Sequence, residues 1–282
     1  MDISLEVIII ALIIGISVGI IASIVGLGGG ILIIPLAIFV LGFAPKEAIF
    51  ISLLYMTFLT ISASIRYIKM KQVNYRLAAL YDIFDVPGVI IGGLLTLVIV
   101  GNILAGICGS VILVLAILLF RKEAIVETPL HDEDLKHDKE HSMNGKEPEV
   151  EHKYGVRNPY IASISSFTGG LVAGLVGVGG GTTDTTSMIL LGLDPKKAAA
   201  TSEFAMALTA ITGLIVHIFI GTYTGSLVWP IMIAIGGFIG SQIGTTLSPR
   251  VDSKKIRKAL ACIAFSTGIL MILLMFGIGW TV

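Results

Sequence analysis

The sequence predicts an all-α, polytopic membrane protein built from two inverted repeats of about five helical segments each. Three observations support this prediction: an apolar composition, a glycine-rich motif that occurs twice, and an opposite distribution of basic residues in the loops of the two halves. Of the 282 residues, 55% are hydrophobic and 13% are charged, and the mean hydropathy is +0.96. Soluble domains carry about 25% charged residues, so water is not the main solvent of this chain.

The apolar segments follow the same order in each half. In the first half they cover residues 7–25, 31–41, 48–65, 88–100 and 104–120, and in the second half residues 161–178, 182–191, 206–220, 227–243 and 259–278. A helix needs about 20 residues to cross the hydrocarbon core, so we expect about 8 to 10 transmembrane segments. The second segment of each half is too short to cross alone. It is predicted to form a broken helix or re-entrant hairpin with the first segment, with the glycine-rich turn inside the membrane.

One charged stretch divides the chain into three parts. We predict a first transmembrane repeat at residues 1–120, a charged cytoplasmic linker at residues 121–157, and a second, inverted repeat at residues 158–282. The linker contains four of the five histidines, irregularly spaced among acidic residues. This spacing does not match a metal-ligand pattern. We therefore expect neither a metal site nor a cofactor.

The two halves carry the same motif at matching places. The sequence GLGGG at residues 26–30 returns as GVGGG at residues 177–181, and each is followed by a short apolar run and a Pro-Lys pair. Ser52 aligns with Ser202, and the glycines of residues 87–92 align with those of residues 236–240. Internal repetition of this length is typical of transporter folds.

The loops of the two halves differ in charge. In the first half the loop before the fourth segment has basic residues at positions 66, 69, 71 and 76, and the loop at 101–102 is uncharged. In the second half the loop at 221–225 is uncharged, and the next loop has basic residues at 250, 254, 255, 257 and 258. Short cytoplasmic loops are rich in Lys and Arg. The halves are therefore predicted to have opposite orientations in the cell membrane, with the linker in the cytoplasm and both termini outside.

The glycine clusters are candidates for binding an anion. Glycine lets the backbone approach a ligand and adopt positive φ, and the following helix offers unpaired N–H groups. Close helix packing is the alternative use of glycine in membranes, but two clusters at matching positions before half-length segments favour a binding site. Hydroxyl groups nearby would complete the hydrogen bonding of an oxyanion. The predicted substrate-binding residues are Gly28, Gly29, Gly30, Ser52, Gly179, Gly180, Gly181, Thr182, Thr183, Thr201, Ser202 and Gln242. For Gln242, a bond to a neighbouring helix is the alternative.

Three ionisable residues of the second half are candidates for ion coupling, namely Asp184, Glu203 and His217. An ionisable group inside a membrane is a functional candidate because it is costly to bury. The alternative for Asp184 is a helix cap that faces an aqueous vestibule. The alternative for Glu203 is an interface position beside Lys196 and Lys197.

Asp82 and Asp85 form a second acidic pair, on one face of the fourth segment of the first half. Residues three apart lie on the same side of a helix. A helix cap or a salt bridge to Arg76 explains them at least as well as a role in transport.

Four features together resemble the TauE/SafE family of sulfite and organosulfonate exporters. They are GLGGGILIIP at residues 26–35, its echo from Gly177, the pair Thr201 and Ser202, and the glycine turn at residues 87–92. The resemblance covers both halves and implies export, less often import, of small sulfur-containing anions such as sulfite or sulfoacetate. The chain departs from the family pattern at Thr186, where a proline is expected, and at Asp184 and Glu203, where apolar residues are usual. These departures leave the individual substrate and the coupling ion open.

We therefore predict a secondary transporter, not an enzyme, that exports sulfite, sulfoacetate or another organosulfonate by alternating access. A passive anion channel would use the same cavity. An intramembrane aspartyl protease is the enzyme alternative, suggested weakly by Asp82 and Asp184. No phosphate-binding loop of an ATPase occurs in the sequence.

The expected partners are a small anionic substrate and the lipid bilayer. Nucleic acid is not expected, because the net charge is zero and no basic stripe occurs. The residues do not decide between proton and sodium coupling, nor between a monomer and a homo-oligomer.

Overall fold

The computed structural model describes residues 5–25, 28–126, 159–190, 193, 195–247 and 253–277. In these ranges it contains helices and their connections but no strand. The helices are α1 (Leu5–Val25), α2 (Gly30–Pro35) with a π-helical turn η1 (Leu36–Val40), α3 (Pro45–Lys69), α4 (Tyr75–Val98), α5 (Gly101–Val126), α7 (Pro159–Val176), α8 (Gly181–Leu190), α9 (Pro195–Ile220), α10 (Val228–Leu247) and α11 (Ser253–Met275). The all-α prediction is confirmed. The predicted linker lies outside the described residues from residue 127 on, and α5 extends into its first residues.

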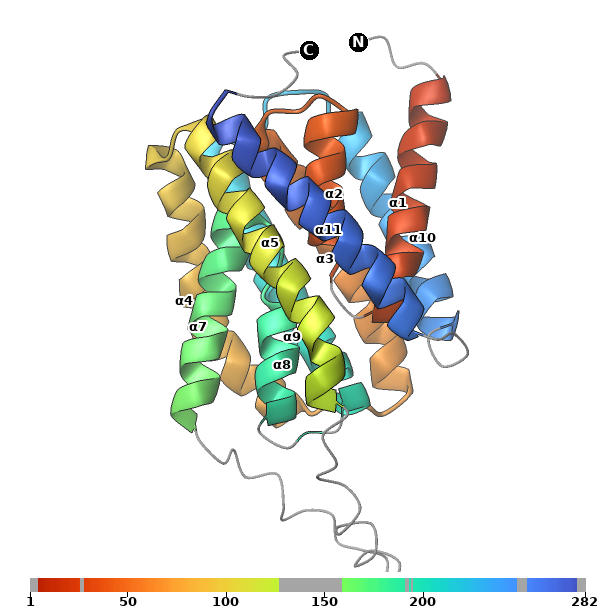
Figure 1. Ribbon diagram of the computed structural model, residues 1–282. Helices are drawn as coiled ribbons and strands as arrows, with labels where there is room; N and C mark the ends of the chain where they lie inside the picture. Colours follow the sequence, from red (N-terminus) through yellow and green to blue (C-terminus); the bar gives the residue numbers. More distant parts are fainter. Residues whose placement is uncertain are drawn as a thin grey trace, which may run out of the picture.

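Six of these helices are long and apolar enough to cross a membrane, namely α3, α4, α5, α9, α10 and α11. The remaining helices form one hairpin in each half: α1 runs into the bundle and α2 returns, and α7 and α8 do the same from the other end (Figure 1). The roughly 8 to 10 transmembrane segments predicted from the sequence exceed these six because that prediction also counted the helices of the two hairpins. A polypeptide turn inside the membrane is tolerated because protein surrounds it.

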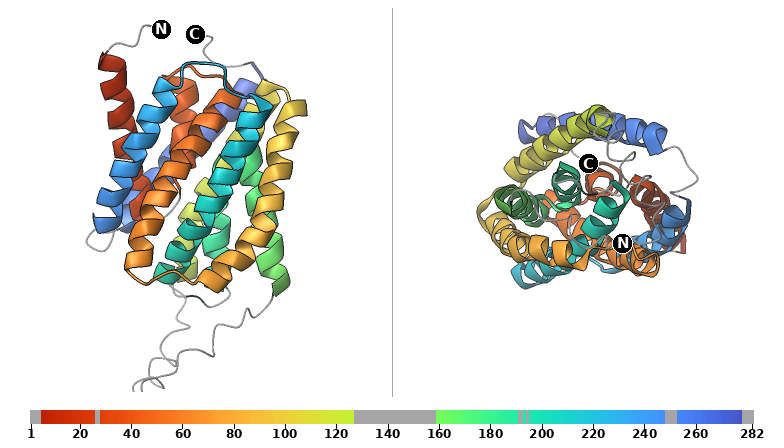
Figure 2. Two further views of the ribbon diagram at one scale, coloured as in Figure 1. Left: turned by 180° about the vertical axis from the view of Figure 1, so that it is seen from behind. Right: turned by 90° about the horizontal axis from the view of Figure 1, so that it is seen from below.

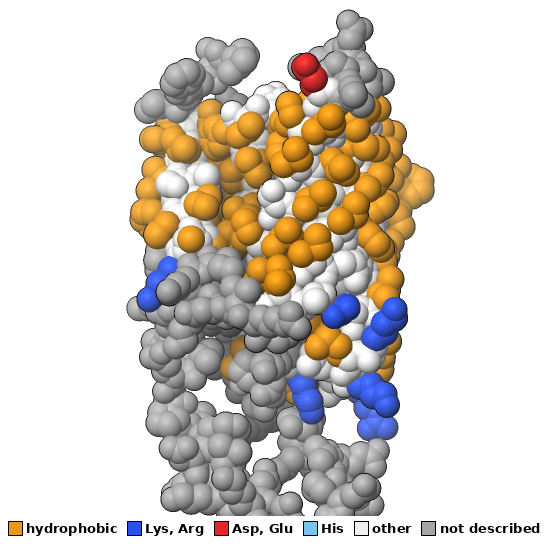
Figure 3. All heavy atoms as spheres, turned by 90° about the vertical axis from the view of Figure 1, so that its right-hand side faces the viewer, with side chains coloured by type: hydrophobic (Ala, Val, Ile, Leu, Met, Phe, Trp, Pro, Cys, Tyr) orange, Lys and Arg blue, Asp and Glu red, His pale blue; other side chains and the backbone are white. Residues whose placement is uncertain are grey.

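Equivalent helices of the two halves begin at opposite ends of the bundle. Helix α1 begins near the N label, whereas α7 begins at the far end, where α5 finishes (Figure 1). An inverted repeat requires this arrangement; the internal duplication and its orientation in the membrane stay predictions. Figure 3 shows a broad hydrophobic belt, with Lys and Arg side chains gathered at the end opposite the chain termini.

The helices are arranged so that each half contributes to both sides of the molecule. On one face α10, α3, α9 and α4 lie side by side in that order (Figure 2), and each neighbouring pair is in contact. Helices α5 and α11 cross the opposite face together (Figure 1). The hairpin helices pack across the halves, α1 against α10 and α4 against α7.

Glycines bring these two cross-half helix pairs into backbone contact. A Cβ on Gly15 of α1 would overlap the carbonyl oxygen of Ile233 on α10, and a Cβ on Gly170 of α7 would overlap that of Asp85 on α4. The same spacing recurs in both pairs, where Gly240 meets Ile16 and Gly92 meets Leu171. Small residues permit such close approach between membrane helices. The contacts therefore match α1 with α7 and α10 with α4, position by position.

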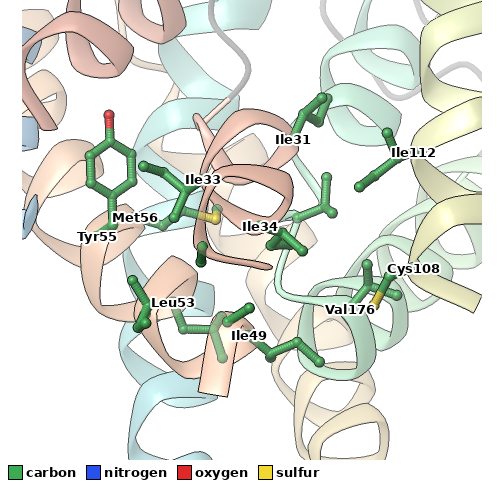
Figure 4. Close-up of a cluster of buried hydrophobic side chains, with 14 of the residues drawn as sticks. Ile31, Ile33, Ile34, Ile49, Leu53, Tyr55, Met56, Cys108, Ile112 and Val176 are labelled. Atoms are coloured by element: carbon green, nitrogen blue, oxygen red, sulfur yellow. The ribbon is translucent and has the colours of Figure 1, made fainter. Parts of the chain in front are cut away.

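Helix α2 is buried in the centre of the bundle. Figure 4 shows Ile31, Ile33 and Ile34 of α2 among Ile49 of α3 and Val176 of α7, and all five belong to one apolar core. Because α2 is enclosed by other helices, the turn that precedes it lies inside the protein.

Candidate functional site

The two glycine-rich turns meet inside the bundle. A Cβ placed on Gly30 would lie 2.6 Å from the carbonyl oxygen of Gly177 and 2.8 Å from Cα of Val178. Gly29 has φ +79° and Gly179 has φ +85°, a region that glycine enters without a steric penalty. The structure thus brings together the glycine motifs that the sequence placed 151 positions apart, from residues 26–30 to residues 177–181.

The matched serines both form hydrogen bonds to the second turn. The hydroxyl of Ser52 on α3 donates to the carbonyl of Gly177 at 2.6 Å, and that of Ser202 on α9 donates to the carbonyl of Gly181 at 3.0 Å. Both serines are buried. Each hydroxyl oxygen therefore lies at the turn, and its proton is donated to a backbone carbonyl oxygen.

Two buried methionines fill the space between the turns. The Sδ atom of Met206 lies 2.7 Å from a Cβ placed on Gly28 and 3.0 Å from one placed on Gly179, and Cε of Met56 lies 3.1 Å from the Gly28 position. Figure 4 shows Met56 next to the isoleucines of α2. These two residues were not among the predicted site residues, although each follows one of the matched serines by four positions. A thioether side chain is flexible, so it can rearrange more easily than a branched one.

Glu203 places a carboxyl group beside the first turn. The residue is 1% exposed, and neither of its side-chain oxygens has a hydrogen-bond partner among the described residues. The backbone of Gly28 and the side chain of Tyr55 are its neighbours. Lys197, one of the two lysines considered as neighbours in the sequence, is exposed. Glu203 therefore points into the bundle rather than to its surface.

Asp184 is enclosed in the same way. It is the fourth residue of α8, it is completely buried, and its two oxygens have no hydrogen-bond partner among the described residues. A cap facing an aqueous vestibule would be exposed and would accept a backbone N–H. The cap interpretation is therefore wrong.

The alternative of a helix cap or salt bridge is also wrong for Asp85. The cap of α4 is Asn74, whose side chain accepts the N–H of Leu77 at 3.1 Å. Asp85 is completely buried, and its oxygens have no hydrogen-bond partner in the described parts of the chain. Arg76 is exposed, whereas Asp85 is enclosed in the protein, so the two do not form the salt bridge.

Two predicted substrate residues are engaged elsewhere. Gln242 donates from Nε2 to the backbone oxygen and the hydroxyl of Ser62, each at 2.8 Å, and so joins α10 to α3. The hydroxyl of Thr201 accepts the N–H of Asn74 at 3.1 Å at the start of α4. Both contacts hold helices together, which for Gln242 is the alternative that the sequence left open.

The threonines that begin α8 contribute less than expected. Thr183 donates its hydroxyl to the carbonyl of Gly180 at 2.5 Å, within the second turn. The side chain of Thr182 lies outside the described residues. The second turn is thus stabilised by its own helix.

His217 lies apart from the turns and connects two helices. Its Nε2 lies 2.9 Å from the carbonyl oxygen of Gly174 on α7, and its Nδ1 lies 3.2 Å from the hydroxyl of Thr222. The imidazole is completely buried. These contacts favour a structural role over ion coupling.

We expect His217→Ala to lower the stability of the protein by about 1 to 3 kcal/mol, because the buried Gly174 carbonyl would lose its donor. The pH dependence of transport is expected to stay as in the wild type. Thermal unfolding in detergent and transport at several pH values in liposomes measure both effects. Loss of the pH dependence in a well-folded variant would assign His217 to ion coupling instead.

Comparison with known proteins gives one consistent relationship. Residues 11–271 match the family model described as Sulfite exporter TauE/SafE. The chain is 28% identical over 261 residues to the probable membrane transporter protein YunE of Bacillus subtilis, with 88% of this chain and 91% of that protein covered. It is 24% identical over 275 residues to a probable membrane transporter protein of Methanocaldococcus jannaschii, with 93% and 94% covered. No solved structure matches the chain.

Proposed function

Because the chain belongs to the TauE/SafE family of membrane transporters, we propose that it moves a small sulfur-containing anion across the cell membrane at its two glycine-rich turns. Sulfite, sulfoacetate and other organosulfonates are the substrate class, and export by alternating access is the mode. The direct contact between the turns at Gly30 and Gly177 carries the proposal. The basic end of the molecule in Figure 3 would face the cytoplasm.

The turns offer the chemistry that an oxyanion needs. The first N–H groups of α2 and α8 have no acceptor within their own helices, and the positive ends of the two helix dipoles lie there. Ser52 and Ser202 add hydroxyl groups at the same place. The oxygens of a sulfite or sulfonate group would accept hydrogen bonds from these N–H groups, and from the two serine hydroxyls once these turn away from the backbone carbonyls that they bond here.

The anion reaches the turns only when the methionines move. Met56 and Met206 pack against Gly28 and Gly179 in the present conformation. We infer that a rearrangement of α3 against α9, which carry these two side chains, opens the site. Uphill accumulation driven by an ion gradient would distinguish this transporter from a passive channel.

The protease alternative finds no support in the arrangement of the acidic residues. It pairs Asp82 with Asp184, whereas Asp85 is the aspartate beside Asp184. Both Asp85 and Asp184 are completely buried. Hydrolysis needs water and a peptide at the paired carboxyl groups, and these two are sealed from solvent.

Binding of the proposed substrates is tested by thermal unfolding of the detergent-purified protein with a panel of small anions. We expect sulfite or sulfoacetate to raise the melting temperature, because a ligand at 100 times its Kd stabilises the folded state by about 2.7 kcal/mol. Chloride and amines are expected to have no such effect. If no sulfur-containing anion shifts the transition, the proposed substrate class is wrong.

Matched alanine variants locate the site within the same assay. Gly29→Ala places a Cβ 2.7 Å from Cε1 of Tyr55 at φ +79°, whereas Gly42→Ala has a similar φ of +71° and no atom within 4 Å. Gly180→Ala, without a positive φ, provides a second variant at the turns. Only Gly42→Ala is expected to keep the anion-dependent shift. A wild-type shift in both turn variants would place the anion elsewhere.

A further inference from the structure

Two aspartates from different halves lie next to each other inside the bundle. Asp85 of α4 has Asp184 of α8 as a neighbour, and both are 0% exposed. None of their four side-chain oxygens has a hydrogen-bond partner in the described ranges. Gly169 and Gly180 pack closely over Asp184, whose oxygens lie 3.2 Å from a Cβ placed on either glycine. Water is therefore excluded from the pair.

The hydroxyl groups around the pair give their protons to other acceptors. Ser166 of α7 donates to the backbone oxygen of Tyr81 at 2.5 Å, and Thr209 of α9 donates to that of Ala205 at 3.2 Å. The hydroxyls of Tyr81 and Ser187 bond each other at 2.5 Å. The two carboxyl groups consequently receive no compensating donor from these side chains.

Among the side chains that the structure describes, no positive charge faces the pair and balances it; the side chain of Lys196 lies outside that part of the chain. The titratable neighbours are Tyr81 and Asp82, both on α4. Helices α7 and α8 contain no basic residue. The basic residues of α9 are Lys196, Lys197 and His217; Lys197 is exposed, and His217 contacts the carbonyl of Gly174.

The matching place in the other half of the molecule is apolar. The glycine contacts match α1 with α7 and α10 with α4, the GLGGG motif matches α2 with α8, and the serines match α3 with α9. The resulting counterparts are Ile233 for Asp85, Ile33 for Asp184, Ala11 for Ser166, Leu59 for Thr209, Trp229 for Tyr81 and Leu36 for Ser187. The first four counterparts are buried in one apolar core, with Trp229 and Leu36 packed against it, and Figure 4 shows Ile33 within it. The same helix packing therefore forms without any of the polar groups.

We propose that Asp85 and Asp184 form a proton-binding site in which the two carboxyl groups share one proton. Two adjacent carboxylates in a site of low dielectric constant cannot both stay ionised without a cation. A proton needs only the two carboxyl oxygens. No group of three or more side chains able to ligate a metal was found among the described residues, which favours a proton over a metal ion.

The site is connected to the second glycine-rich turn by a single helical turn. The N–H of Asp184 donates to the carbonyl of Gly180 at 3.0 Å, so a movement of the turn also moves this carboxyl group. Once the pair separates and meets water, the shared carboxyl proton passes to a water molecule and leaves two carboxylates. This coupling role rests on the proposed anion transport; the proton site itself does not.

The pH dependence of unfolding tests the proton site without any substrate. The folded protein would hold one proton more than the unfolded chain at neutral pH, so its folding constant should fall by up to about tenfold for each unit of rising pH. The double variant Asp85→Ile with Asp184→Ile copies the counterpart residues and is expected to fold, because apolar replacement of a buried charged pair is often neutral or stabilising. It should lose this part of the pH dependence. The Asn double variant at the same positions keeps the side-chain shape and should lose it as well.

Ile33→Val combined with Ile233→Val is the matched control, since it alters the apolar counterpart and should leave the pH dependence unchanged. Glu203 stays in all variants, so its own contribution cancels. An unchanged pH dependence in both aspartate double variants overturns the proposal. A stabilisation by sodium at constant pH that both double variants abolish would reassign the site to a metal ion.

Transport in liposomes tests the coupling role of the aspartate pair and the proposed substrate as two separate claims. With the membrane potential clamped, a gradient of one pH unit should drive sulfoacetate accumulation of up to about tenfold on one side of the membrane: the acidic side if the anion exchanges for a proton, as export from the cell would require, or the alkaline side if the two move together. The double isoleucine variant should only equilibrate sulfoacetate, while the control accumulates it. Accumulation by the double variant as in the wild type would refute the coupling role. If the wild type moves no sulfoacetate but shows the expected pH dependence of unfolding, the substrate proposal fails and the proton site stands.

Discussion

Gly174→Ala is expected to destabilise the protein by about 3 kcal/mol or more, because the added methyl group has no space at the crossing of α4 and α7. A Cβ on Gly174 would overlap the carbonyl oxygen of Val89 and lie 2.8 Å from the backbone nitrogen of Gly93. Both obstacles are backbone atoms, which cannot rotate away like the end of a side chain. The helices would have to separate, and the contact between the Gly174 carbonyl and His217 would be disturbed as well.

Two further glycines make this prediction quantitative. A Cβ on Gly19, the matching position in α1, would lie 2.9 Å from the carbonyl oxygen of Gly237, and one on Gly101 would meet nothing within 4 Å. Destabilisation should decrease in the order Gly174→Ala, Gly19→Ala, Gly101→Ala, the last staying within about 0.5 kcal/mol of the wild type. The yield of monodisperse protein and the melting temperature measure this order. Equal melting of Gly174→Ala and Gly101→Ala would show that the helices do not approach as closely as described.

The general architecture could be predicted from the sequence because it depends on local patterns. Apolar segment length identified the helices, and the half-length segments after residues 26–30 and 177–181 identified the two hairpins. Each of these signals lies within about 20 consecutive residues, the length of one membrane helix. The pairing of α1 with α10 and of α4 with α7 has no such local signal. It depends on glycines whose partners are backbone atoms of a distant helix.

The same limit explains why the pairing of the acidic residues was not predicted. Helical spacing correctly placed Asp82 and Asp85 on one side of α4, but it could not show that Asp184 lies against Asp85. The cap and salt-bridge interpretations rested on sequence neighbours such as Arg76. A signal was nevertheless present: aligning the halves places Ile233 opposite Asp85 and Ile33 opposite Asp184. A polar residue with an apolar counterpart in a repeat marks a position where packing alone does not determine the side chain.

The positions of the two methionines could have been predicted from the matched serines. Met56 and Met206 each follow a matched serine by one helical turn, so they lie on the same helix face as Ser52 and Ser202. Apolar residues at helical spacing are usually interpreted as core, and both methionines are indeed buried. Only the structure shows that they pack against the glycines of both turns.

Glu203→Gln is expected to strengthen binding of sulfite or sulfoacetate at least about tenfold at neutral pH and to remove its pH dependence. The Glu203 carboxyl neighbours the Gly28 backbone, and Ser202 beside it bonds Gly181 of the second turn. An anion at the turns would therefore approach a carboxylate. Two like charges about 5 Å apart repel by about 3 kcal/mol at an effective dielectric constant of about 20.

The sign of the pH effect follows from this repulsion. Protonation of Glu203 removes the negative charge, so wild-type binding should tighten as the pH falls, and the bound anion should in turn favour the protonated form by the same factor. Glutamine has the shape of the protonated side chain at every pH, so the variant should bind tightly throughout. Glu47→Gln is the matched control, because this carboxyl accepts the N–H of Ala44 at 3.1 Å at the start of α3. Titration calorimetry between acidic and neutral pH, where sulfoacetate keeps its sulfonate charge, measures both variants. Weaker binding by Glu203→Gln with an unchanged pH profile would place the anion away from the first turn, whereas tight, pH-independent binding would identify Glu203 as the group through which protons control access of the substrate.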